Sequence, residues 1–230
     1  MKKDIFLLDA DDTVLDFHGA SALGIRDTLI GFGKEWKDEY GAQFKTLNDG
    51  LWKRLERGEL TREKLLEIRF PMYLNELGFA DISSDEFNEK YLHYIANNPM
   101  FMDGAEAFLH RLPNYGRVYI VTNGSYSIQQ SRFRIVEMQK YASDVFISQR
   151  IGADKPSPVY TQFVLEHIPD FSKERAVWIG DSLSADIKAA NEAGIDSIWY
   201  NPKNKPLKGD AAPTFTANSF DEIEKILEIL

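Results

Sequence analysis

Short apolar runs alternate with helical patterns through much of the chain. The runs have the length and composition of buried strands and cover residues 5–8, 118–121, 145–147, 176–179 and 195–200. Amphipathic patterns typical of helices cover residues 105–112, 127–138, 158–167, 183–193 and 220–230, the last with Ser219 as its cap. This alternation predicts a parallel sheet with right-handed crossovers, and therefore an α/β fold with a Rossmann-like core.

A second texture occupies residues 16–98, which carry helical patterns and many aromatic and charged residues. Thr61 and Ser84 are expected to cap two of these helices, and Pro71 to kink or break one of them. The block predicts an all-helical cap domain inserted into a catalytic core formed by residues 1–15 and 99–230. Because it follows the first strand directly, we expect it to act as a lid that selects the substrate. The polar stretch 201–213 is expected to be a surface loop.

Composition excludes several classes of function. The 230 residues include no cysteine, so disulfides, thiolate metal sites and cysteine nucleophiles are excluded. A net charge of -9 argues against binding of a nucleic-acid polymer, although a small phosphorylated substrate remains compatible when a cation is bound. There is no apolar run long enough to span a membrane and no signal-peptide pattern, so we expect a cytoplasmic protein without a membrane partner. The sequence does not indicate an oligomeric state.

Polar groups follow three of the expected strands and also occupy one loop. They are Asp9-x-Asp11-x-Thr13, Thr122-Asn123-Gly124-Ser125, the loop residue Lys155, and Gly180-Asp181-Ser182 with Asp186. Parallel strands bring their carboxyl ends to one edge of a sheet, where ligands of open α/β folds bind. We therefore expect these groups to form one site.

The chemistry that suits this group is phosphoryl transfer. One carboxylate can attack phosphorus, and a second carboxylate two residues later can protonate the leaving oxygen. Carboxylate and carbonyl oxygens are the ligands that Mg²⁺ prefers. A hydroxyl group and a lysine ammonium can hold the oxygens of the transferring phosphoryl group.

The four motifs and their order resemble those of haloacid dehalogenase-superfamily phosphatases. The resemblance implies that Asp9 is the nucleophile, that Asp11 is the general acid and base, and that Thr122 and Lys155 bind the phosphoryl group, with Asn123 and Gly124 beside them. It also implies a Mg²⁺ ion on Asp9, on the backbone carbonyl of Asp11 and on Asp181. Asp186 would either support the metal ligands without touching the ion itself or cap the helix expected over residues 183–193.

Further local features are similar to those of bacterial pyrimidine 5′-nucleotidases. They are Asp16 and Phe17 after the first motif, Leu51-Trp52, the stretch 56–61 and Arg69-Phe70 in the helical block, and Gln129-Gln130 with Arg132 after the second motif. The resemblance implies a nucleoside monophosphate as substrate. Phe17 is a candidate for the substrate pocket, whereas Trp52, Phe70 and Tyr73 are expected in the core of the block rather than in a base-stacking platform.

Two alternatives remain at this point. The chain could be a phosphatase or phosphomutase for another small phosphate, such as a sugar phosphate. From another class, it could be a non-enzymatic receiver domain that is phosphorylated on aspartate. A dehalogenase is disfavoured because its reaction does not need a general acid at Asp11.

Overall fold

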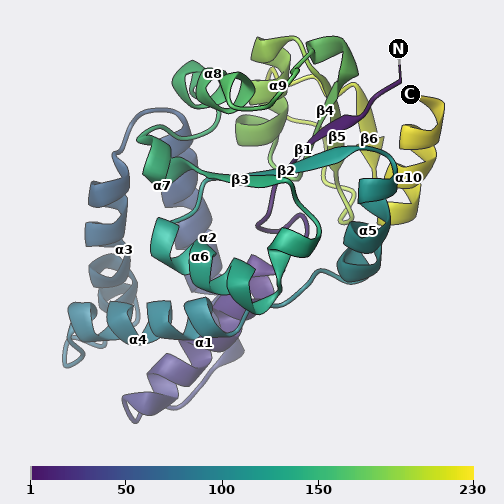
Figure 1. The fold of residues 1–230 in the computed structure, drawn as a ribbon. Helices are drawn as coiled ribbons and strands as arrows, with labels where there is room; N and C mark the ends of the chain where they lie inside the picture. Colours follow the sequence, from purple (N-terminus) through teal and green to yellow (C-terminus); the bar gives the residue numbers. More distant parts are fainter. Residues whose placement is uncertain (1) are drawn as a thin grey trace. The chain divides into compact units, whose positions relative to one another are not determined.

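The chain forms two compact units in the computed structural model, which describes residues 2–230 (Figure 1). One unit comprises the chain up to Asp16 together with Phe101–Leu230, and the other comprises Phe17–Met100. The junctions thus follow Asp16 and Met100. Among the described residues, no helix is both long enough and apolar enough to cross a membrane.

The first unit is built on a six-stranded parallel sheet in the order β3-β2-β1-β4-β5-β6. Its strands are β1 (Ile5–Leu8), β2 (Arg117–Thr122), β3 (Asp144–Ile147), β4 (Ala176–Gly180), β5 (Asp196–Tyr200) and β6 (Phe215–Ala217). This is the Rossmann strand order, so the predicted α/β class is confirmed, and it differs from the 2-1-3-4-5 order of receiver domains. The strand order reverses between β1 and β4, and open sheets bind their ligands beside such a topological switch point.

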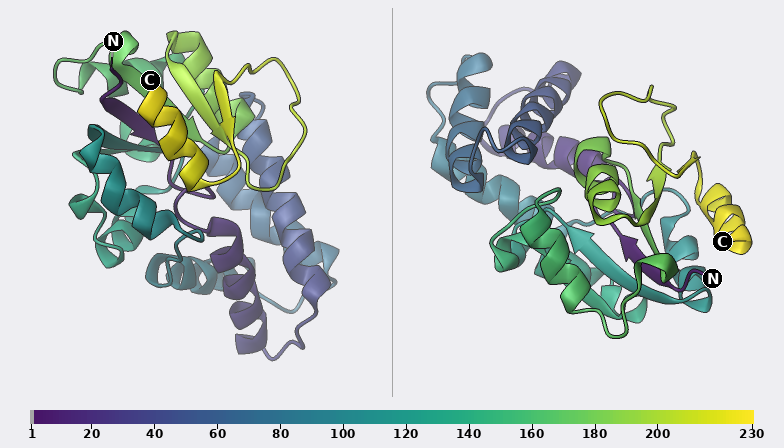
Figure 2. Two further views of the ribbon diagram at one scale, coloured as in Figure 1. Left: turned by 90° about the vertical axis from the view of Figure 1, so that its right-hand side faces the viewer. Right: turned by 90° about the horizontal axis from the view of Figure 1, so that it is seen from above.

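Alternate residues of each strand face two separate apolar cores. Phe6 and Leu8 belong to the core under α5 (Ala105–Arg111), α6 (Tyr126–Ile135) and α10 (Phe220–Ile229). Ile5 and Leu7 belong to the core under α8 (Pro158–Glu166) and α9 (Lys188–Ala193). The helices therefore cover both faces of the sheet, as Figures 1 and 2 show. This burial on both faces explains why the strands read as continuous apolar runs.

Three elements of this unit differ from the sequence predictions. The edge strand β6 was not predicted, because its three residues are too short to give an apolar pattern. The short helix α7 (Ser148–Ile151) was also not predicted, and it follows β3 directly. The expected single helix over 183–193 is a π-helical turn, Leu183–Ile187, followed by α9.

The second unit contains four helices among the described residues and no strand. They are α1 (Phe17–Gly31), α2 (Asp38–Glu56), α3 (Arg62–Glu76) and α4 (Ser84–Asn97). Buried aromatic rings join the helices: Phe44 stacks on Phe70 with centroids 5.5 Å apart, and Tyr73 meets Phe44 edge-on at 5.1 Å. Phe70 and Tyr73 therefore belong to the core, as expected. Trp52 is half-buried and lies 5.3 Å from the Arg62 guanidinium.

Two expectations for this unit are corrected and one is confirmed. Thr61 caps α3 as expected, since its hydroxyl accepts a hydrogen bond from the backbone N–H of Lys64. The cap of α4 is Ser83 rather than Ser84, because Ser83 has the extended backbone that a cap requires and accepts from the N–H of Glu86. Pro71 does not break α3, which continues to Glu76 because its buried neighbours hold the helix in the aromatic core.

The end of β4 and the π-helical turn approach each other very closely. The carboxylate of Asp186 accepts a hydrogen bond from the backbone N–H of Ser182 at 3.1 Å and lies over Gly180. A Cβ atom at Gly180 would be 2.3 Å from Cγ of Asp186, which is shorter than any van der Waals contact. Glycine at this strand end therefore makes room for the buried Asp186 carboxylate.

Replacing Gly180 with alanine is expected to lower the free energy of unfolding by about 1–3 kcal/mol, because the added methyl group must displace a buried carboxylate. Urea unfolding measures the change. Gly50→Ala is the matched control: Gly50 is an exposed residue within α2 with open space around it, so the same substitution should be neutral or stabilise by up to about 1 kcal/mol. Equal stability of Gly180→Ala and the parent would contradict the close approach.

Candidate active site

The loop after β1 folds back tightly and fixes the first two candidate residues. The backbone N–H of Asp9 donates to the carbonyl of Ile179 at 2.9 Å, so Asp9 continues the pairing of β1 with β4. The N–H groups of Val14 and Leu15 both donate to the carbonyl of Ala10. Asp12 adopts a left-handed backbone with φ 61°, which aspartate tolerates better than most residues. The result is a turn that starts at the topological switch point.

Asp9 is buried between a cation and a hydroxyl group. Its Oδ1 accepts from Nζ of Lys155 at 2.7 Å, and its Oδ2 accepts from the hydroxyl of Thr13 at 2.8 Å. Lys155 is also buried, and its ammonium donates further to Oδ1 of Asp186 at 2.6 Å and to the carbonyl of Val121 at 2.8 Å. These three bonds match the three hydrogens of the ammonium group. Lys155 therefore joins the ends of β1 and β2 to the turn after β4.

Burial and charge act against each other in this group. Burial raises the pKa of Asp9 well above its usual value, and the Lys155 ammonium opposes that rise, while the carboxylates of Asp186 and Asp181 add to it. For Lys155, burial alone would lower the pKa, but the carboxylates of Asp186 and Asp9 outweigh burial and raise it. The ammonium is therefore charged, and its positive charge offsets part of the negative charge around it.

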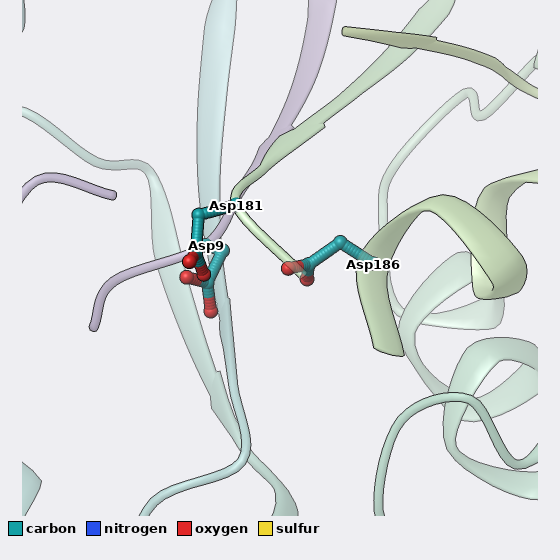
Figure 3. A group of neighbouring side chains, drawn as sticks. All are labelled: Asp9, Asp181 and Asp186. Carbon is teal, nitrogen blue, oxygen red and sulfur yellow. The ribbon is translucent and has the colours of Figure 1, made fainter. Parts of the chain in front are cut away.

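Three carboxylates converge beside this cation. One oxygen from each of Asp9, Asp181 and Asp186 lies within 4.8 Å of the others. Figure 3 shows the Asp186 carboxylate directed toward those of Asp9 and Asp181, which lie next to each other. The main chain of Asp181 is held by the indole N–H of Trp199, which donates to its carbonyl at 2.9 Å. Carboxylate oxygens are the ligands that hard divalent cations such as Mg²⁺ take. The donor set therefore fits such a cation.

Asp186, expected either near the metal site or as a helix cap, accepts hydrogen bonds from the backbone next to its own turn and from Lys155. Its Oδ2 accepts from the N–H of Ser182, the residue before the π-helical turn, and its Oδ1 accepts from Lys155. The indole N–H of Trp178 also donates to Oδ1 at 3.4 Å. The side chain is 1% exposed, so it is part of the buried charge network rather than a surface cap.

Asp11 lies in different surroundings from Asp9, although only two residues separate them. Its carboxylate accepts from the Gln129 amide at 2.9 Å and from the Arg132 guanidinium at 2.5 Å. The same Gln129 amide donates to the hydroxyl oxygen of Thr122 at 2.9 Å. Because that hydroxyl accepts from Gln129, its own hydrogen can be donated to another oxygen. Asp11 and Thr122 are thus connected through α6.

Asn123 connects two loops through its side chain. Its amide donates to the carbonyl of Lys155 at 2.9 Å and accepts from the Lys155 N–H at 2.7 Å. The amide therefore holds the main chain that carries the lysine, and a phosphate contact of Asn123 would come from its backbone. At Gly124, a Cβ atom would be 2.4 Å from Cγ of Gln129, so glycine here admits the Gln129 side chain.

Phe17 belongs to the other unit, where it is the first residue of α1. It is half-buried, and its ring centroid lies 6.2 Å from that of His18. Its role in a substrate pocket stays a prediction.

Several residues of the site were given no role from the sequence. Thr13 lies in the first motif but was not assigned, and Gln129 and Arg132 are one helical turn apart on α6, a spacing that could have indicated a shared face. Trp199 gave no sequence signal. Lys205, in the expected surface loop, lies 3.6 Å from Oδ2 of Asp181.

Comparisons with known proteins agree with this arrangement. The family model of haloacid dehalogenase-like hydrolases matches residues 3–194. The HAD-hydrolase YfnB of Bacillus subtilis is 36% identical over 97% of this chain and 94% of its own. Its crystal structure, bound to magnesium, superimposes with a TM-score of 0.92 at 35% identity and covers 99% of both chains.

Two further relatives have names that state a substrate class. The pyrimidine 5′-nucleotidase PynA of Streptococcus pneumoniae is 32% identical over 96% of this chain and 94% of its own. The pyrimidine 5′-nucleotidase YjjG of Escherichia coli is 26% identical over 99% of both chains. A family match over most of the chain, with relatives above 30% identity along nearly its whole length, shows the family. The chain is an enzyme that belongs to the haloacid dehalogenase-like hydrolases.

Proposed function

We propose that this hydrolase is a Mg²⁺-dependent phosphomonoesterase that acts through an aspartyl-phosphate on Asp9, with nucleoside 5′-monophosphates as substrates. The observation that carries the proposal is the buried Asp9 carboxylate, which Lys155 and Thr13 hold at the switch point of the sheet. A carboxylate fixed by two donors at the carboxyl end of a strand suits nucleophilic attack more than a structural role.

In the first half of the proposed reaction, an Asp9 oxygen attacks phosphorus and the bond from phosphorus to the leaving oxygen breaks. Asp11 gives its proton to that oxygen, which departs as an alcohol. The Thr122 hydroxyl donates to an oxygen of the transferring phosphoryl group, on which negative charge is spread. As the Asp9 oxygen attacks, the Lys155 ammonium exchanges its hydrogen bond to Asp9 for one to a phosphoryl oxygen, and its positive charge stabilises the group throughout. The products of this half are the alcohol and a phosphoryl group on Asp9.

In the second half, the Asp11 carboxylate takes a proton from a water molecule, and the resulting hydroxide oxygen attacks the same phosphorus atom. The bond between phosphorus and Asp9 breaks, inorganic phosphate leaves, and both carboxyl groups return to their starting state. One residue thus serves as the general acid in the first step and as the general base in the second.

The Mg²⁺ ion would be held by Asp9, Asp181 and the Asp11 carbonyl, with the Asp186 carboxylate adjoining. When bound, it supplies positive charge that lets a phosphate approach several carboxylates and that stabilises charge in the transition state. Three carboxylates against one buried ammonium leave an excess of negative charge, which supports the need for a cation.

The proposed substrate class rests on the relatives and on the helical unit. Two relatives that match this chain along nearly its whole length are named pyrimidine 5′-nucleotidases. The helical unit holds none of the phosphoryl-transfer residues and enters the chain at Phe17, directly after the loop with Asp11 and Thr13. We therefore assign substrate selection to Phe17–Met100 and the chemistry to the sheet unit. A hexose phosphatase is the competing substrate assignment.

Asp9→Asn is expected to lower kcat at least about 1000-fold while leaving the fold intact, because an amide of similar size is a far weaker nucleophile. Phosphate release from several monoesters measures the loss. Asp12→Asn is the matched control, since it makes the same change in the same loop and asparagine also tolerates a left-handed backbone. Substantial turnover by Asp9→Asn would refute the assignment of the nucleophile.

Removal of divalent cations by a chelator is expected to abolish turnover, and added Mg²⁺ to restore it. Binding of Mg²⁺, measured by titration calorimetry, should tighten by up to about fivefold in Lys205→Met, since a half-exposed ammonium 3.6 Å from Asp181 opposes the cation. Lys203→Met, an exposed lysine of the same loop, should bind as the parent does. Full activity after chelation would contradict the proposed cofactor.

Pyrimidine nucleoside monophosphates are expected to exceed hexose phosphates in kcat/KM. Phe17→Ala should change the ratio of these two kcat/KM values more than it changes kcat/KM for 4-nitrophenyl phosphate. The reason is that an aromatic ring suits a flat base better than a hydrated sugar. Phe79→Ala, another half-buried phenylalanine of the helical unit, is the matched control. Better turnover of hexose phosphates, or an equal loss on all substrates in Phe17→Ala, would overturn this assignment.

A further inference from the structure

Helix α6 carries two buried polar side chains that the proposed steps do not use. Gln129 and Arg132 are each 1% exposed and lie one turn apart, and the Arg132 guanidinium donates to the Gln129 carbonyl oxygen at 2.8 Å. Burial of an amide and a guanidinium is costly unless their hydrogen bonds are satisfied. Such a pair in a short surface helix therefore indicates a specific partner.

That partner is the Asp11 carboxylate, which receives one donor on each oxygen. Gln129 donates to Oδ2, and Arg132 donates to Oδ1 in an ion pair whose arginine is almost completely buried. Two donors on two oxygens fix the plane of the carboxylate as well as its location. The partners are 118 and 121 residues away in the sequence, so this contact belongs to the tertiary fold.

The surroundings of Gln129 hold it in this orientation. Its amide also donates to the Thr122 hydroxyl oxygen, so one side chain fixes the position of the Asp11 carboxylate relative to the proposed phosphoryl-binding hydroxyl. Its Cγ would lie 2.4 Å from a Cβ atom at residue 124, and the glycine found there lets it pass. The glycine and the glutamine of this segment thus fit one another.

We propose that Gln129 and Arg132 are positioning residues for proton transfer by Asp11, an inference that rests on the proposed phosphatase reaction. When Asp11 passes its proton to the leaving oxygen, negative charge develops on both carboxylate oxygens. Donors that already face those oxygens stabilise this charge without reorganisation. The pair also keeps the carboxyl group in one orientation, and misplacement of a catalytic group by about 1 Å can cost roughly 100-fold in rate.

A merely structural role makes a different prediction. If the pair only attached α6 to the loop after β1, its loss would slow all substrates alike. If it assists proton donation, the loss falls on substrates whose leaving group needs a proton, because a good leaving group departs as an anion without one. The leaving group therefore separates the two roles.

The test compares phenyl phosphate with 4-nitrophenyl phosphate, which have similar size and differ in how well the phenol leaves. In Gln129→Met, which keeps the volume and removes the donor, kcat/KM for phenyl phosphate is expected to fall about 10- to 100-fold, against less than about threefold for 4-nitrophenyl phosphate. Gln130→Met, at the exposed neighbour on the same helix, should leave both unchanged. The ratio kcat/KM is used because it reports the step that releases the phenol.

Arg132→Lys is the second variant, used in case Gln129→Met does not fold. It keeps the buried positive charge. It should show the same selective loss to a smaller extent, because an ammonium lacks the planar fork of the guanidinium; Arg134→Lys at an exposed residue is its control. Equal losses on both esters, or no loss on either, would overturn the inference while parent activity and the Asp9→Asn result still support the phosphatase. Failure of the parent to hydrolyse any phosphate ester would instead refute the proposed function.

Discussion

The site depends on the three hydrogen bonds that the buried ammonium of Lys155 donates. The ammonium joins the Asp9 carboxylate at the end of β1, the Val121 carbonyl in β2 and the Asp186 carboxylate in the turn after β4. A buried cation is tolerated only when its hydrogens and charge are compensated, and here all three hydrogens are used. Two carboxylates share the compensation of its charge, and one side chain thus connects three strand ends. Asn123 then fixes the backbone that delivers this lysine.

The charge balance around Lys155 explains how an acidic protein can handle an anionic substrate. Three carboxylates converge beside one buried ammonium, so negative charge is in excess. Burial raises the pKa of Asp9, and the carboxylates of Asp186 and Asp181 add to that rise. Lys205 offsets little of the excess charge, because its side chain is 55% exposed and screened by water. The proposed divalent cation would remove that excess and reverse the local field, whereas the net charge of -9 on the whole chain repels anions. The residues of the site thus leave an excess of negative charge that the proposed cation would offset.

The sequence predicts those parts of the structure that local patterns determine. Apolar runs identify β1 to β5 because these strands are buried on both faces, whereas the edge strand β6, with only Phe215 and Ala217 apolar, is too short to leave a pattern. The residues expected to carry chemistry on the sheet unit lie close to one another, because parallel strands end at one edge. The π-helical turn that returns Asp186 over Gly180 was not predicted, since a helical pattern over 183–193 does not distinguish one kind of turn from another. Gln129 and Arg132 were recognised only as features of a resemblance, because the carboxylate they contact is more than a hundred residues away.

The first motif places two aspartates two residues apart, and their surroundings make them chemically distinct. Asp9 faces an ammonium, a hydroxyl group and two other carboxylates, so its oxygens lie where a cation and a phosphoryl group can meet them. Asp11 faces an amide and a guanidinium from α6, which place one hydrogen-bond donor on each of its oxygens. Identical side chains acquire different tasks from the donors around them, as in other enzymes with paired carboxylates. Because α6 begins just after β2 and carries the Thr122 link as well, the helix that orients the proposed acid is also attached to the residue proposed to bind the phosphoryl group. The proposed acid and the proposed phosphoryl-binding hydroxyl are therefore connected through one side chain, Gln129, and not only through the backbone of the first motif.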